Sequence, residues 1–139
     1  MELAWLYATN PKASRDPSKA LPFARRATEL APNEPLCWNT MALVEYRLGQ
    51  WSAGDEAVRR SIRLNPEGAT PYDLLILAMC DHQLRRHESA RENLERANRR
   101  IADRGIADQF PAADLRALRA EAEALLGGTS PGDSSGRGR

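Results

Sequence analysis

Residues 35–66 read PLCWNTMALVEYRLGQWSAGDEAVRRSIRLNP. Apolar residues at helical spacing run from Pro35 to about Leu48, and Gly49 suits the left-handed position that ends a helix. A second helix is predicted from about residue 53 to Leu64. It stops before Pro66, because the residue that precedes a proline disfavours helical geometry. The stretch therefore predicts two helices joined by a tight turn, a helical hairpin.

The hairpin pattern recurs along the chain. Pro32 and Pro66 each follow a helical stretch, and they lie 34 residues apart. Small residues recur at the same spacing in the first two units and 36 residues further on in the third: Ala8, Ala42 and Ala78; Ala20, Gly54 and Ala90; Ala27, Ser61 and Ala97. Small side chains in register indicate equivalent close approaches between helices. The chain is therefore read as three repeats.

The remaining segments complete this organisation. Asp16 can cap a helix that begins at Pro17 and runs to about Leu30. A last helix over about 112–126 is expected to cover the apolar end of the stack. The predicted domain spans 1–126, with units at about 1–34, 35–70 and 71–104. The tail, 127–139, holds no large apolar residue and is expected to be disordered.

The middle unit resembles a tetratricopeptide repeat. The matching positions are Trp38, Met41, Ala42, Gly49, Gly54, Ser61, Leu64 and Pro66. The sequence departs from the pattern at Glu45 and Val58, and in the third unit at Arg85, where the hairpin glycine belongs. Residues 3–11 and 15–17 are similar to modules at the C-terminus of large bacterial proteins, among them serine/threonine kinases and β-propeller proteins.

This resemblance implies an all-α fold. It would be a right-handed α-solenoid of about three hairpins with a C-terminal capping helix. The resemblance also implies that the concave groove, lined by the first helix of each hairpin, binds a peptide or helix of a partner protein.

Composition favours a soluble cytoplasmic protein. The 20 basic and 19 acidic residues nearly cancel, so the overall charge does not call for nucleic acid or an anionic membrane. The basic run from Arg85 to Arg104 is interleaved with glutamates in favourable i, i+4 order, which is typical of a solvated helix face. No apolar run reaches the ~20 residues of a membrane span. The two cysteines, Cys37 and Cys80, are read as reduced thiols.

Catalytic and metal-binding motifs are not recognisable. Cys80 and His82 point to different sides of a helix, and His82 and His87 are separated by a helix end. Neither a nucleophile motif nor a Gly-rich phosphate loop is present. We therefore expect no enzyme activity, no cofactor and no metal.

Two surfaces are predicted to bind a partner protein or peptide, whose identity the sequence does not reveal. The first is the groove, where repeat register places Asn39, Leu43, Tyr46 and Arg47 from the middle unit, and Tyr72, Leu75, Ile76, Met79 and His82 from the third. The alternative is that some of these side chains pack on the second helix of their hairpin or on the final helix.

The second surface lies on the first helix, whose apolar residues surround it nearly completely. Trp5 and Leu6 are predicted to face a separate protein or a second copy of the chain. Three functions therefore remain open. They are a peptide- or helix-binding module, a self-association or intramolecular docking module of a larger assembly, and, less favoured, a nucleic-acid-associated helical repeat.

Overall fold

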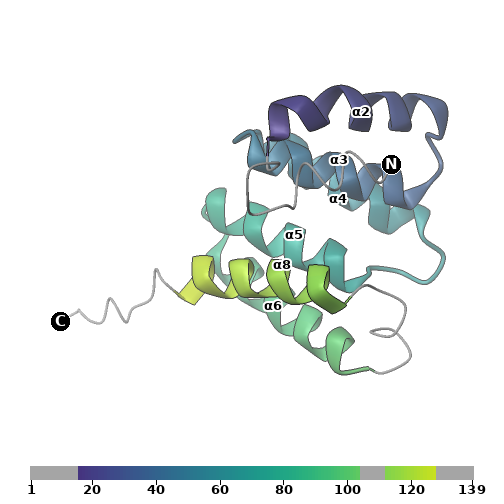
Figure 1. The fold of residues 1–139 in the computed structure, drawn as a ribbon. Helices are drawn as coiled ribbons and strands as arrows, with labels where there is room; N and C mark the ends of the chain where they lie inside the picture. The colour runs from purple at the N-terminus through teal and green to yellow at the C-terminus, as the bar shows by residue number, and fades with distance from the viewer. Residues whose placement is uncertain (1–15, 104–111, 128–139) are drawn as a thin grey trace.

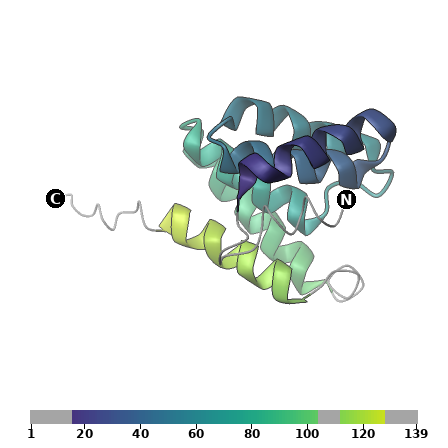
Figure 2. The same ribbon diagram turned by 45° about the horizontal axis from the view of Figure 1, so that its top comes forward.

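The computed structural model describes residues 16–103 and 112–127. These residues form helices and no strands, arranged as helices packed in sequential pairs (Figures 1 and 2). The helices are α2 (Pro17–Leu30), α3 (Pro35–Arg47), α4 (Trp51–Leu64), α5 (Pro71–Gln83), α6 (His87–Ala102) and α8 (Ala112–Gly127). The all-α prediction is confirmed for this part of the chain. The predicted first helix lies outside the described residues.

The most extensive contacts are within the hairpins α3–α4 and α5–α6. Helix α2 packs on α3, and α4 packs on α5 and so connects the two hairpins. Figure 1 shows the helices following one another from α2 at one end to α6 and α8 at the other. Helix α8 packs mainly on α5 and touches α6 less. The described helices therefore bury their apolar faces against near neighbours in sequence, with α8 at the far end of the row.

Local signals in the sequence set the helix boundaries. The Asp16 carboxylate accepts a hydrogen bond from the Ser18 amide at 3.2 Å, and Pro17 follows as the first residue of α2, as predicted. Thr70 and Asp73 form a reciprocal capping box at the start of α5. Two helices extend one or two residues beyond their approximate predicted bounds. Helix α4 begins at Trp51 rather than near 53, and Gly127, assigned to the tail, is the last residue of α8.

The two complete hairpins share one geometry. Helices α3 and α5 begin 36 residues apart, and so do α4 and α6. Both first helices end in the same turn, in which the amide of Gln50 or Arg86 donates to the carbonyl five residues earlier, at 2.9 and 2.8 Å. The left-handed residue is Gly49 in one turn and Arg85 in the other, with φ of 79° and 69°. The departure noted at Arg85 therefore lies in a backbone conformation that favours glycine.

Close helix approach depends on small residues. A Cβ atom added at Gly54 of α4 would lie 3.1 Å from the Ala42 carbonyl oxygen of α3 and 3.3 Å from Cys80 Sγ of α5. Ala42 and Ala90 are themselves fully buried. Helix α4 can therefore contact α3 and α5 together only with a very small residue at position 54.

The two equivalent turns predict that Arg85→Gly and Gly49→Ala change the free energy of unfolding in opposite directions. Arg85→Gly should raise the free energy of unfolding by about 0.5–1 kcal/mol, because a side chain at positive φ is strained. Gly49→Ala should lower it by about 1 kcal/mol through the same effect, since its Cβ would meet no atom within 4 Å. Urea unfolding followed by circular dichroism measures both. Equal signs for the two changes would contradict the shared turn geometry.

Candidate partner-binding surfaces

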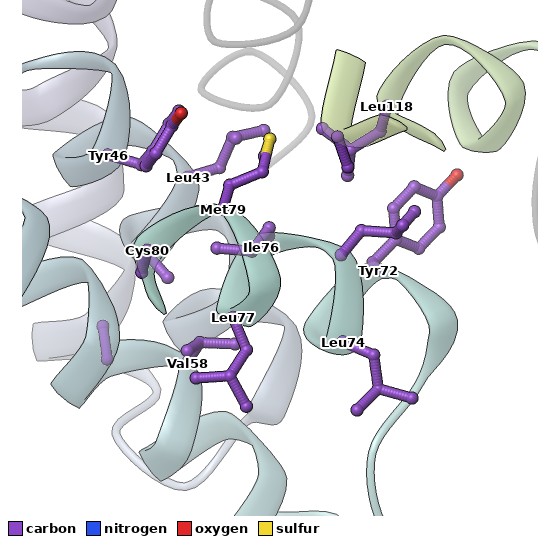
Figure 3. Close-up of a cluster of buried hydrophobic side chains, with 14 of the residues drawn as sticks. Leu43, Tyr46, Val58, Tyr72, Leu74, Ile76, Leu77, Met79, Cys80 and Leu118 are labelled. Atoms are coloured by element: carbon purple, nitrogen blue, oxygen red, sulfur yellow. The ribbon is translucent and has the colours of Figure 1, made fainter. Parts of the chain in front are cut away.

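Helix α8 covers the face of α5 that the sequence assigned to a partner. Its inward residues Leu115, Leu118 and Ala122 are buried and belong to the same core cluster as the α5 side chains. Figure 3 shows Leu118 extending from α8 toward α5, close to Tyr72. Leu74 and Leu77 leave α5 on the opposite side. In the third unit, a helix of the same chain therefore occupies the predicted groove.

The apolar groove residues of α5 are consequently core residues. Leu75, Ile76 and Met79 have no exposed surface, and Tyr72 has 7 %. The expectation that these side chains form an exposed apolar surface is wrong, because α8 lies on that face and removes it from solvent. The alternative that they pack on the final helix describes the structure better. Burial also raises the pKa of the Tyr72 hydroxyl.

Groove residues of α3 also face the core or α8. Leu43 is fully buried. Tyr46 is buried, and its hydroxyl accepts a hydrogen bond from Gln83 Nε2 of α5 at 3.2 Å. The Arg47 guanidinium forms a two-pronged ion pair with Glu121 of α8, with Nη2 lying 2.7 Å from Oε1. Helix α8 is thus held by apolar burial against α5 and by the ion pair between Arg47 of α3 and Glu121.

Asn39 connects helices rather than facing solvent. Its Nδ2 donates to Asp73 Oδ1 of α5 at 2.6 Å, and the Ser61 hydroxyl of α4 donates to the same oxygen at 3.0 Å. The Thr70 amide donates to the other carboxylate oxygen at 3.0 Å. Burial raises the pKa of Asp73, and these donors oppose that shift. The cluster joins α3, α4 and α5 at one end of the hairpins.

His82 lies apart from the other predicted groove residues. It is half-buried near the end of α5, and its ring lies 5.0 Å from the ring of His87, edge to face. The pair opens into a cleft of about 690 Å³ at the turn between α5 and α6. The residues that line this cleft are Trp51, His82, Gln83, Arg85, His87, Arg91 and Leu126. Sequence reasoning missed the cleft, because its walls come from four helices and a turn.

Trp5 and Leu6, the second predicted surface, lie outside the described residues. Among the large apolar side chains that the structure does describe, Phe23 and Leu30 of α2 and Leu36 of α3 are exposed. Leu36 borders a second hollow of about 380 Å³ next to Asp73.

Within residues 16–103 and 112–127, no three His, Cys, Asp or Glu side chains are placed to hold a metal ion together. Cys80 is fully buried, and its pKa is raised to about 12 by burial and by nearby carboxylates, chiefly Asp55 and Asp81. A thiol in that state is protonated at neutral pH and is a poor nucleophile. None of the described helices is long and apolar enough to cross a membrane.

Comparison with known proteins identifies no relative. No protein-family model, no curated protein and no solved structure matches this chain.

The packing of α8 predicts a measurable cost for loosening it. Leu118→Ala should lower the free energy of unfolding by about 2–4 kcal/mol, because it removes buried methyl groups and leaves a cavity above α5. Arg116→Ala on the exposed side of α8 is the matched control and should stay within about 0.5 kcal/mol of the native chain. Denaturant unfolding measures both. A Leu118→Ala cost below about 1 kcal/mol would show that α8 does not complete the core.

Proposed function

We propose that this chain is a helical-repeat module of the tetratricopeptide type that binds a partner protein. The observation that carries the proposal is the repetition of one hairpin geometry. Helices α3–α4 and α5–α6 have the same 36-residue offset, the same type of turn and the same stacking order. Repeats of this kind bury a continuous core by stacking, and the faces they leave are surfaces for binding.

The seam between hairpins supports the tetratricopeptide assignment. Gly54, one of the positions that carries the sequence resemblance, lies where α4 contacts both α3 and α5. Ser61, another such position, donates to Asp73 of the next hairpin. Residues picked from the repeat pattern therefore lie at helix contacts. The right-handed solenoid, with a third hairpin formed by α2 and the segment before it, is part of the same proposal.

Helix α8 illustrates the kind of ligand that the stacked first helices accept. It presents an apolar stripe to α5 and a carboxylate to Arg47, which is the usual chemistry of an amphipathic helix in a groove. Over the third unit this place is taken within the chain. A partner would therefore bind to a surface that α8 leaves free, or would have to replace α8.

Binding rather than catalysis is the proposed activity, since the reactive side chains are used in packing. Cys80 is buried, and Asp73 and Asp81 accept hydrogen bonds from neighbouring helices. The arginines Arg47, Arg59 and Arg86 are paired with carboxylates, which leaves less uncompensated positive charge for nucleic acid.

Selection from a displayed library of random peptides tests the proposal directly. The immobilised native chain should enrich peptides that share side chains at fixed spacing, and synthetic copies should bind with micromolar Kd. The control is Gly54→Leu, which should lose these peptides because it separates the hairpins. If the folded native chain enriches no peptide family, or if the unstacked variant retains it, the chain is not a peptide-binding repeat module.

A further inference from the structure

The cleft at the α5–α6 turn has a basic lining. Among the described residues, its charged or titratable walls are Arg85, Arg91, His82 and His87, with no carboxylate. Trp51 and Leu126 supply apolar surface beside these groups. A volume of about 690 Å³ falls within the range of ~300–1,000 Å³ typical of ligand-binding clefts.

The positive charges of the two cleft arginines are not neutralised by a described carboxylate. Arg85 and Arg91 are exposed, and neither forms an ion pair with a carboxylate of the described residues. Arg86, next in sequence, behaves differently. It lies 3.3 Å from Asp81 and 3.4 Å from Asp55, in an ion-pair network that ties α4, α5 and α6 together. Arg86 therefore serves the packing of the helices, whereas the Arg85 side chain is available to contact a ligand.

Helix ends add to the positive potential. Trp51 and His87 are the first residues of α4 and α6, and neither helix has a side-chain cap at its N-terminus. Helix N-termini carry partial positive charge, so both reinforce the field of the arginines. A cleft with this wall favours an anionic ligand.

From this charge and shape we infer that the cleft binds an acidic peptide segment of the partner protein. Arg85, Arg91 and the two histidines would contact carboxylates, while an apolar side chain of the segment packs between Trp51 and Leu126. The inference rests on the proposed function and names the chemistry of the partner. The apolar walls and the volume suit a peptide with mixed side chains better than a small free anion.

The position of His82 in the cleft makes this binding depend on pH. Burial, and then the neighbouring His87, lower the pKa of His82, so this ring is mainly neutral at pH 7 in the free protein. A bound carboxylate favours the protonated ring and raises that pKa. The other charged or titratable groups facing the cleft are His87, Arg85 and Arg91, and glutamates and aspartates of the segment remain ionised above about pH 5. Affinity should therefore rise as pH falls from 7.5 to 5.5.

Fluorescence anisotropy with a synthetic probe tests the inference. The probe is a fluorescein-labelled peptide of repeated Asp-Glu-Leu units, and the control probe has Asn-Gln-Leu units. The native chain should bind the acidic probe, and more tightly at pH 5.5 than at 7.5. Arg91→Glu should weaken binding about tenfold, because it reverses one wall charge. Arg99→Glu, an exposed change on the same helix outside the cleft, should weaken it less than about twofold.

Arg85→Gly separates binding from folding. This variant should unfold at a higher temperature than the native chain, yet bind the acidic probe several-fold more weakly, because it relieves the backbone and removes a wall charge. An effect of Arg85→Gly on stability without any effect on binding would overturn the inference.

Other outcomes also decide the matter. No binding of the acidic probe, equal weakening by Arg91→Glu and Arg99→Glu, or equal binding of the uncharged probe would each overturn the acidic-peptide site. Tighter binding of a labelled single-stranded oligonucleotide, lost in Arg91→Glu, would assign the cleft to nucleic acid instead. If library selection enriches peptides without acidic residues, the cleft inference fails while the module still binds peptides.

Discussion

Helix α5 has no side facing solvent from Pro71 to Asp81, because α3, α4, α6 and α8 surround it. A helix that is apolar all round is stable in water only when every face is covered. This requirement explains why α8 packs on α5 at the far end of the stack. Helix α6, the hairpin partner of α5, and the preceding helix α4 cover part of α5. Helix α8 packs on a further face of α5. The rest of the described structure depends on that closure.

Polar contacts give the helices their register. Asp73 receives donors from α3, α4 and its own N-cap, and Asp81 receives Ser89 and Asn93 of α6 at 2.8 and 2.9 Å. Buried carboxylates are costly without such partners, so each favours one placement of the helices around it. Different charged residues therefore serve the stability of the stack and the proposed binding. Arg47 and Arg86 pair with carboxylates of neighbouring helices, whereas Arg85 and Arg91, which form no ion pair with a described residue, line the cleft beside the hairpin turn.

Much of this architecture could be predicted from local sequence. The cap at Asp16, the glycine turn at Gly49 and the recurring small residues are short-range signals, and each predicts a helix end or a close contact. The packing side of Ile76 and Met79 was not predictable in the same way. Helical periodicity indicates that a face is apolar, but whether a final helix or solvent covers it depends on the path of the chain after residue 103. The basic cleft escaped prediction because Trp51, His82, Arg91 and Leu126 are distant in sequence.

Amide hydrogen–deuterium exchange of the native chain tests most directly whether α8 covers α5 throughout the folded state in the absence of a partner. Amides in the middle of α8 should be protected to nearly the same free energy as those of α5, because exposing either requires the same opening. Exchange of α8 at the rate of a free peptide, while α5 stays protected, would contradict the account and show that some other surface covers α5.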